Sequence, residues 1–307
     1  MATARPIRRS DLEPLHEVYS SMVESIPHHP AVIEAQFSKE LLTYSHTDVV
    51  PCVDEGAGAA LVVERGGKPV ALALTALLAK DHSWDSLKAG TGVLRLLLAP
   101  PDAQDEALAV IEAAKAHLRA EGAESLLALH YILGPGFHNT GCAMLPATWP
   151  WLGHWLYLSG FRAKGSEIRF RRPMDDRPDS LELPAEGELR VYRGEYGWPG
   201  ESEFRDTKHL FIDDRDAAQC HNAFAGYYVD GAGRDLVHTE WLGVGEDFRG
   251  RGLGRAMLRQ GLVRAWDEGA RVATLTTAGK NFRAQALYVS EGYVQTDTMW
   301  DFELAAE

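Results

Sequence analysis

Cysteine is scarce in this sequence. Its 307 residues include three cysteines, Cys52, Cys142 and Cys220, which lie far apart along the chain. An odd number of widely spaced cysteines makes neither a disulfide framework nor the paired ligands of a CxxC zinc site. The sequence also has no HExxH or HxxxH pattern. We therefore expect reduced thiols and no metal.

Long apolar runs are missing as well. No window approaches the ~18 consecutive apolar residues that a membrane-spanning helix needs. The first residues, MATARPIRRSDLEPL, lack the apolar core of a secretory signal. We expect a cytoplasmic protein with no membrane partner.

The sequence also lacks an excess of positive charge. The sequence has 44 acidic residues against 31 lysines and arginines, and its formal net charge is −13. A protein that binds duplex nucleic acid needs a basic face to contact the phosphates. The charge balance therefore argues against a nucleic-acid partner.

What the sequence does contain suits a packed protein of two domains. Hydrophobic residues make up 45% of the chain, and 307 residues exceed the usual size of a single core. Residues 174–186, MDDRPDSLELPAE, are rich in acid and proline and show no sustained periodicity, as is typical of a linker. We expect an N-terminal domain at 1–173 and a C-terminal domain at 187–307.

The two halves share patterns that predict one fold present twice. A helical segment ends at Gly122 in the first half and at Gly269 in the second, and a strand-like segment follows each glycine. Residues 58–79 and 223–244 each predict two strands around a glycine-containing turn. Strands and helices mixed in this way indicate an α/β protein with tandem domains.

The first helix is predicted close to the start of the chain. Ser10 is the expected N-cap, and Leu12, Leu15, Tyr19 and Met22 follow on one apolar stripe at helical spacing. Such a stripe faces a core, so we expect these four side chains to be buried.

A glycine-rich loop at 246–258, EDFRGRGLGRAML, carries the strongest chemical signal. It follows a strand-like segment at 236–244, and a helix is predicted to begin near Leu253. Such a loop exposes successive backbone N–H groups, and the helix N-terminus adds positive charge. We infer a site for an anion the size of a diphosphate.

Two common phosphate loops do not fit these residues. In a Walker loop a lysine and a serine or threonine follow the last glycine, but Arg255 and Ala256 follow Gly254 here. A dinucleotide fingerprint has the spacing GxGxxG, whereas Gly250, Gly252 and Gly254 alternate.

The pattern Arg-x-x-Gly-x-Gly at 249–254 resembles motif A of the GCN5-related N-acetyltransferases, the GNAT superfamily. Residues 278–293, AGKNFRAQALYVSEGY, resemble motif B of the same family, with Gly-Tyr in place of the usual Gly-Phe. The resemblance implies two GNAT-like domains, each a mostly antiparallel central sheet flanked by helices. This tandem arrangement is similar in architecture to that of mycothiol synthase.

The resemblance also implies a coenzyme site for acetyl-CoA. Backbone groups of Leu242, Gly243 and Val244 would pair with the pantetheine arm, and Asn281 would contact the coenzyme. The pyrophosphate would lie on the glycine loop, which comprises Arg249, Gly250, Arg251, Gly252, Leu253, Gly254 and Arg255.

The resemblance assigns the proton donor for the departing thiolate to Tyr288. A phenol with a pKa near 10 suits that role if it lies within hydrogen-bond reach. Glu240 is the candidate general base, because it shares a strand face with Leu242 and Val244, and His238 on the same face is the alternative.

The first half lacks the glycine loop. With Gly122 aligned on Gly269, Arg249 falls on Asp102 and Gly252 falls on Asp105. Carboxylates at these positions would repel a phosphate, so we predict a degenerate coenzyme site in the N-terminal domain.

These observations predict an acetyl-CoA-dependent N-acetyltransferase that acts on a small-molecule amine by direct transfer. The alternative is a non-catalytic acyl-CoA-binding or regulatory module that retains the loop. We expect a monomer or a homodimer.

Overall fold

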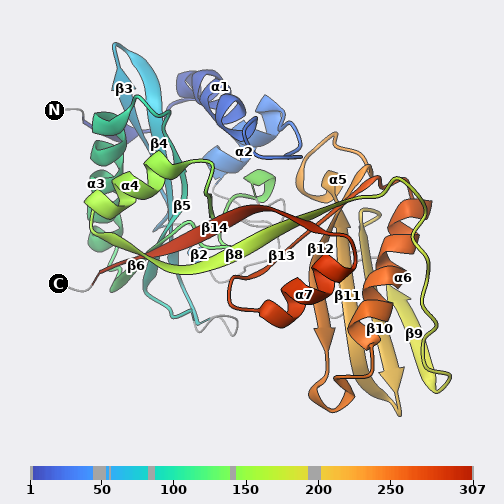
Figure 1. Ribbon diagram of the computed structural model, residues 1–307. Helices are drawn as coiled ribbons and strands as arrows, with labels where there is room; N and C mark the ends of the chain where they lie inside the picture. The colour runs from blue at the N-terminus through green and yellow to red at the C-terminus, as the bar shows by residue number, and fades with distance from the viewer. Residues whose placement is uncertain are drawn as a thin grey trace. The chain divides into compact units, whose positions relative to one another are not determined.

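The computed structural model describes residues 3–43, 53–54, 57–81, 87–138, 143–192 and 202–305 (Figure 1). Cys52 and Cys142 lie outside these residues. Within them, no helix combines the length and the apolar character needed to cross a membrane.

The chain forms two compact units. Unit 1 comprises Met1–Glu167 together with Asp297–Glu307, and unit 2 comprises Ile168–Thr296. The contacts between residues therefore place the end of the chain in the same unit as its first half. The domains expected from the sequence were instead two continuous segments, 1–173 and 187–307, joined by the linker 174–186. Those sequence limits stay a prediction.

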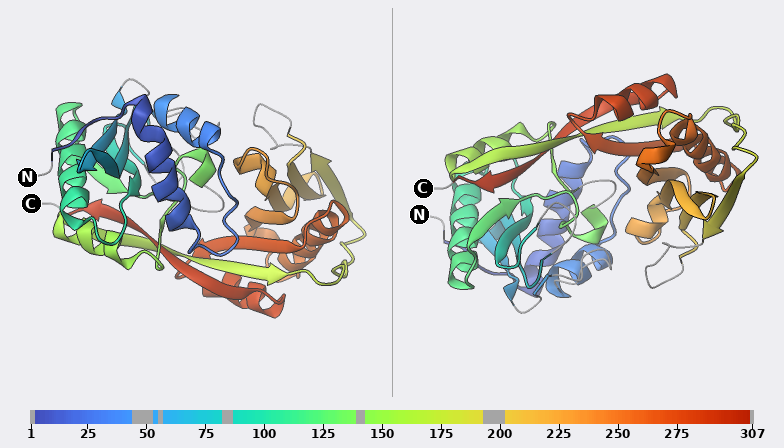
Figure 2. Two further views of the ribbon diagram at one scale, coloured as in Figure 1. Left: turned by 90° about the horizontal axis from the view of Figure 1, so that it is seen from above. Right: turned by 90° about the horizontal axis from the view of Figure 1, so that it is seen from below.

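Unit 1 is built on a sheet with the strand order β1-β3-β4-β5-β6-β14. Helices α3 and α4 lie together on one face of this sheet, and α1 and α2 lie on the other (Figure 1 and Figure 2). In chain order the elements are β1 (Arg5–Pro6), η1 (Arg9–Asp11), α1 (Leu12–Val23), α2 (Glu34–Thr43), β2 (Val53–Asp54), β3 (Ala60–Arg65), β4 (Lys68–Leu78), β5 (Thr91–Leu98), α3 (Gln104–Ala120), β6 (Ser125–Ala128), η3 (Gly136–His138), β7 (Leu145–Pro146), α4 (Pro150–Leu158) and β8 (Phe161–Pro173).

Unit 2 has the strand order β8-β13-β12-β11-β10-β9. Helix α6 packs on β10, β11 and β12. From residue 187 onward the elements in chain order are β9 (Gly187–Tyr192), β10 (Arg205–Ile212), β11 (Arg215–Phe224), α5 (Ala225–Tyr228), β12 (Leu236–Val244), η4 (Glu246–Phe248), α6 (Leu253–Asp267), β13 (Val272–Ala278), α7 (Phe282–Ser290) and β14 (Val294–Leu304). Strand β14 begins in unit 2 and continues into unit 1 from Asp297.

The same order of elements occurs in both units, so the predicted mixed α/β fold with two similar domains is confirmed. An antiparallel pair, β4–β5 or β11–β12, leads into a helix, α3 or α6, and then into a parallel strand, β6 or β13. Gly122 and Gly269 end the two helices with φ values of 90° and 111°. These left-handed conformations suit glycine and stop a helix.

Local expectations were met in part. Leu12, Leu15, Tyr19 and Met22 are all buried, as the stripe predicted. Ser10 as the N-cap is wrong, because α1 begins one residue later with Asp11 as its N-cap.

The segment 223–244 differs from the expected pair of strands. Between β11 and β12 it forms the short helix α5. Gly226 explains why the chain can bend tightly there, since a Cβ at this position would lie 2.6 Å from the carbonyl oxygen of Ala232.

A glycine within α6 sets the distance between this helix and its sheet. A Cβ on Gly261 would lie 2.7 Å from the side-chain nitrogen of Asn222 and 3.0 Å from the sulfur of Cys220. Glycine costs helical stability, but it lets α6 approach β11 closely. The approach buries Leu258 and Leu262 against the sheet.

The last strand of the sequence completes unit 1. In β14, Phe302 pairs with Ala128 of β6 and Met299 pairs with Pro146 of β7. Met299 is fully buried beside Met144. Strand β8 conversely ends in unit 2, where Met174 N, just beyond it, donates to Arg271 O at 2.9 Å.

We predict that Met299→Ala lowers the free energy of unfolding by roughly 2–5 kcal/mol, because it leaves a cavity in a closed core. Urea denaturation followed by circular dichroism measures the change. Val294→Ala on the exposed part of the same strand is the control and should change the midpoint little. Equal effects of the two substitutions would contradict the packing of the last strand.

Candidate functional site

Two parallel strands of unit 2 separate partway along their length. Strands β12 and β13 pair over four residues, from Leu236 with Val272 to Thr239 with Leu275. Beyond Thr239, within the described residues, the edge of β12 that faces β13 carries no ladder pairing. On this side β12 therefore has no strand partner at Leu242 and Gly243 within the described residues.

A β-bulge lies at the point of separation. His221 of β11 pairs with Trp241, whereas the next residue, Asn222, pairs with Thr239. Glu240 is thus the extra residue of β12. Bulges of this kind redirect a side chain and increase the local twist.

The glycine loop follows the free part of β12. Gly250 and Gly252 have φ values of 79° and 80°, and Gly252 is the left-handed N-cap of α6. No atom lies within 4 Å of a Cβ placed on either glycine. Among the described residues, no backbone carbonyl accepts a hydrogen bond from the amides of 250–255. These open N–H groups and the helix N-terminus form the anion-binding geometry that the sequence predicted.

Arginines surround the loop, and each is held by a carboxylate. Arg249 contacts Glu246 at 3.2 Å, and Arg251 contacts Glu186, a residue of the predicted linker, at 2.8 Å. Arg255 and Arg259 both contact the carboxylate of Glu291, the C-cap residue of α7.

Glu240 lies in a small polar network. Arg205 of β10 donates to its Oε2 at 2.5 Å, and the Tyr228 hydroxyl of α5 donates to its Oε1. Burial, followed by the negative charge of Glu240, holds the pKa of Tyr228 well above 10. The carboxylate is one-fifth exposed and is fixed from two sides.

His238, the alternative base, is buried beside Thr274. The two side chains are 3.0 Å apart between Nδ1 and Oγ1. Burial lowers the pKa of His238 to about 4, although Glu240 opposes this change. A histidine with so low a pKa is a weak proton acceptor at neutral pH.

Tyr288 lies in the core of unit 2. Its ring centroid is 5.9 Å from that of Phe170 and 6.0 Å from that of Tyr293, and the residue is 6% exposed. Asn281 begins the same helix, α7, because its Oδ1 accepts from Ala284 N at 3.3 Å. Asn281 is thus a helix cap, and its contact with a coenzyme stays a prediction.

The sequence did not predict Arg205 and Tyr228 as partners of Glu240. It also did not predict that Glu291 pairs with Arg255 and Arg259. No local pattern identifies them, because Arg205 is 35 residues from Glu240 along the chain. Strand pairing across β10, β11 and β12 brings Arg205 to Glu240, and the helices α5, α6 and α7 supply the other groups.

The corresponding opening in unit 1 is filled by the protein itself. Strands β5 and β6 also pair over four residues, ending at Leu94 with Ala128. The next residue, Arg95, is 1% exposed and donates to Leu133 O at 2.7 Å and to Gly134 O at 3.1 Å. The segment that follows β6 is thereby bound across the gap.

The acidic side chains at the start of α3 are also bound by a group of the protein itself. Arg65, the last residue of β3, donates to the carboxylates of Asp102 at 2.8 Å and of Glu106 at 2.7 Å. The hydrogen bond from Arg65, followed by its charge, lowers the pKa of Glu106. Acidic side chains therefore stand where the second unit presents free amides.

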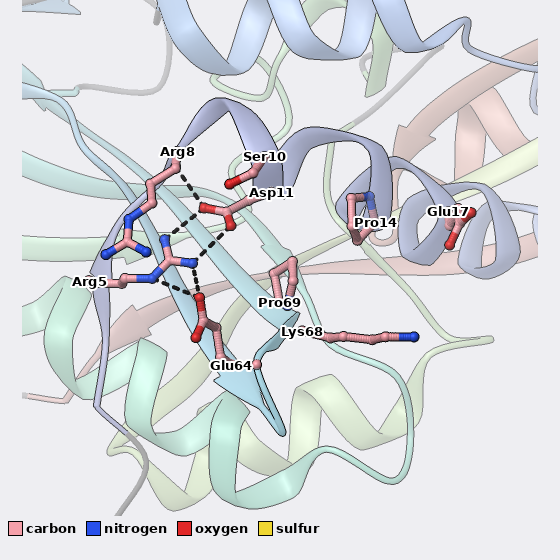
Figure 3. Close-up of a pocket in the computed structure, with 10 residues that line it drawn as sticks. Arg5, Arg8, Ser10, Asp11, Pro14, Glu17, Glu64, Lys68 and Pro69 are labelled. Atoms are coloured by element: carbon pink, nitrogen blue, oxygen red, sulfur yellow. Dashed lines mark hydrogen bonds and ion pairs between the residues drawn. The ribbon is translucent and has the colours of Figure 1, made fainter.

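Unit 1 has a surface pocket of about 410 Å³ at the start of α1 and the β3–β4 turn (Figure 3). Arg5 crosses it and binds Asp11 at 2.7 Å and Glu64 (Figure 3). The three cationic and three anionic side chains of its wall balance each other, the cations being Arg5, Arg8 and Lys68 and the anions Asp11, Glu17 and Glu64. We regard it as a structural junction.

Residues 176–293 match the sequence profile of the acetyltransferase (GNAT) family. This segment belongs to the GNAT family. It contains the separated strand β12, the glycine loop and α7, so each candidate site residue of unit 2 lies inside the matched region. A search of curated protein sequences found no significant match.

Solved structures show that the GNAT fold extends over the whole chain. A tandem GNAT protein from the clavulanic acid biosynthesis pathway aligns over 100% of both chains, with a TM-score of 0.69 and 15% identity. A GCN5-related N-acetyltransferase from Sphaerobacter thermophilus covers 98% of this chain and 95% of its own, with a TM-score of 0.65 and 14% identity. At these identities the likeness is one of fold, and it confirms the tandem GNAT architecture.

A third similar structure is a glucosamine N-acetyltransferase region of a fungal multi-domain β-N-acetylglucosaminidase. It covers 99% of this chain and 38% of that protein, with a TM-score of 0.66 and 14% identity. The likeness to that protein is confined to its GCN5-related region.

We predict that His238 makes the GNAT segment sensitive to acid. Its pKa is about 4 in the folded protein, against 6.5 ordinarily, so the unfolded state binds a proton first as the pH falls. The free energy of unfolding should fall by about 3 kcal/mol between pH 7 and pH 4 from this residue alone. Urea denaturation at several pH values measures this loss.

His238→Gln should remove most of that contribution, while the exposed His154→Gln serves as the control. A pH dependence that is the same in the wild type and in His238→Gln would show that His238 is not its source.

Proposed function

We propose that the protein is an acetyl-CoA-dependent N-acetyltransferase that transfers the acetyl group directly to a small-molecule amine. One observation carries the proposal: the open amides of 250–255 follow a strand, β12, whose pairing with β13 ends at Thr239. A diphosphate attached to an extended amide-containing arm fits both features together. Coenzyme A has this chemistry.

The residues present suit this ligand. The pyrophosphate accepts from the loop amides, where the helix N-terminus favours negative charge. The pantetheine amides pair with the backbone of Leu242, Gly243 and Val244, beyond the point where β12 separates from β13. The thioester then lies near the bulge at Glu240, where β12 and β13 separate.

Transfer requires the amine to lose a proton and the coenzyme sulfur to gain one. The nitrogen attacks the thioester carbon, the carbon–sulfur bond breaks, and Tyr288 protonates the departing thiolate. Glu240 accepts the proton from the nitrogen, directly or through water. We favour Glu240 over His238, because the pKa of His238 is lowered to about 4.

The partners of Glu240 leave this role open to it. Arg205 binds one carboxylate oxygen and Tyr228 binds the other. Arg205 donates twice to Oε2, whereas Oε1 accepts from Tyr228 alone, so one lone pair of Oε1 remains for a water molecule or an ammonium group. The two partners hold the carboxylate in a fixed orientation, which favours proton transfer to a defined position.

Unit 1 is proposed to bind no coenzyme. Arg95 binds the segment that occupies its strand gap, and Arg65 holds acidic side chains at the start of α3. The expected stoichiometry is one coenzyme per chain.

The test is to incubate the protein with acetyl-CoA and a panel of aliphatic amines, amino sugars and amino acids, and to follow the release of free thiol. Release that depends on an amine supports the enzyme. Tight coenzyme binding without turnover on any amine would instead support a non-catalytic acyl-CoA-binding module.

Gly252→Glu is expected to lower acetyl-CoA affinity at least tenfold, because a carboxylate enters the anion site. Gly231→Glu is the matched control, since Gly231 also has a φ of 80° and open space around its Cβ but lies before the other end of β12. Isothermal titration calorimetry measures affinity and stoichiometry. Equal affinity in both variants, or two coenzymes per chain, would refute the assignment.

Tyr288→Phe is expected to lower kcat about a hundredfold while the coenzyme Kd stays within twofold, because the change removes a proton donor alone. Tyr157→Phe is the control at the related position of the first half, where the side chain is exposed. An unchanged kcat would remove Tyr288 from the mechanism.

A further inference from the structure

A tryptophan side chain is exposed beside the β-bulge of β12. Trp241 directly follows Glu240, the extra residue of the bulge, and it is 50% exposed. Single exposed apolar side chains are common on protein surfaces, so exposure alone does not assign a role to this one. Its position does, because it lies next to the candidate base.

The side chain of Trp241 faces away from α6. Cys220 and Asn222 both face α6, because a Cβ on Gly261 of that helix would lie 3.0 Å from the sulfur of one and 2.7 Å from the Nδ2 of the other. Successive residues of a strand alternate between its faces, so His221, which lies between them, faces the other way. Trp241 pairs with His221 and therefore shares its face.

Glu240 faces away from α6 as well. Its carboxylate contacts Arg205, and the next residue, Asp206, faces α6, where it forms an ion pair with Arg264 at 3.2 Å. Arg205 and its partner thus lie on the opposite face. The bulge therefore directs two consecutive side chains, those of Glu240 and Trp241, to one face, whereas a regular strand would direct them to opposite faces.

The indole lies along β12 among uncharged groups. A Cβ on Gly243 would lie 2.7 Å from Nε1 of Trp241 and 3.2 Å from its Cε2, so glycine at this position leaves room for the ring. Across from these two residues, β11 carries Gln219 and His221. Burial lowers the pKa of His221 to about 4, so its ring is uncharged at neutral pH. On the side of β13, within the described residues, β12 has no strand partner beyond Thr239.

This combination of groups suits a particular kind of amine. Oε1 of Glu240 keeps one lone pair, which can accept from one ammonium group. An indole attracts a nearby cation and packs well on the apolar face of another ring. The uncharged groups named above provide no partner for a second charge of either sign. The site therefore fits a single amino group attached to an uncharged ring.

We propose that Trp241 determines acceptor specificity, and that the acceptor is a primary monoamine carried on an uncharged ring that packs on the indole. An aromatic ring and a sugar ring both present such a face, and the test separates them. This inference rests on the proposed function, because it takes Glu240 as the group that accepts the proton of the amine. It narrows the acceptor from small amines in general to those that carry a ring.

The test measures kcat and KM of the full chain at saturating acetyl-CoA with amines of different shape. Phenethylamine and glucosamine carry a ring, butylamine has none, and putrescine is a diamine without a ring. One ring amine should have a kcat/KM at least about tenfold above those of butylamine and putrescine, because it alone gains the contact with the indole. The better of the two ring amines identifies the kind of ring.

Trp241→Ala should reduce the ratio of kcat/KM between the preferred ring amine and butylamine from at least about tenfold to within about threefold. The loss should lie in KM, because Glu240 and Tyr288 remain in place. Trp241→Phe, which keeps a smaller ring, should give an intermediate ratio. Titration calorimetry with acetyl-CoA checks that each variant is folded.

Trp300→Ala is the matched control. Trp300 is also a partly exposed tryptophan in a strand, with 39% exposure, but it lies in the part of β14 that belongs to unit 1. The ratio in this variant should stay at the parent value.

The outcomes separate this inference from the proposed function. If the parent acetylates butylamine or putrescine as efficiently as the ring amines, or if Trp241→Ala keeps the parental ratio, the role of Trp241 is refuted and the acetyltransferase stands. An equal loss on every amine in Trp241→Ala would refute it too, because selectivity would be unchanged. If the parent acetylates no amine, the proposed function fails, and this inference fails with it.

Discussion

The separation of β12 from β13 is the constraint on which the candidate site depends. Parallel strands normally satisfy each other's backbone groups along their shared length. Here the pairing stops after four residues, so in the described part of the chain β12 has no strand partner on this side beyond Thr239. The bulge at Glu240, the glycine loop and the start of α6 all follow from this point in a short stretch of chain.

The two units use the same framework in opposite ways. In unit 2 the helix N-terminus and the strand edge are left open, with Gly250 and Gly252 providing clear space. In unit 1 the equivalent polar groups are satisfied internally, since Arg95 binds the segment after β6 and Arg65 binds the acidic start of α3. A fold that satisfies its own polar groups gains rigidity and gives up a ligand site.

Much of the fold could be predicted from local pattern. The helical stripes and the glycines at 122 and 269 depend on residues near one another in sequence, and the structure has them where they were expected. Predictions were wrong where a distant group competed with the local signal. Asp11 replaces Ser10 as the cap of α1, and its carboxylate is bound by Arg5 in β1.

The sequence by itself determined the glycine loop and its chemistry, because positive φ, open amides and a helix start are properties of a few consecutive residues. The tertiary structure alone decided the partners of Glu240 and Glu291 and the unit to which the last strand belongs. These depend on the register of strands and the packing of helices that are distant in sequence. Arg205 contacts Glu240 because strands of one sheet hold both residues. Glu291 contacts both Arg255 and Arg259 because α6 and α7 pack side by side.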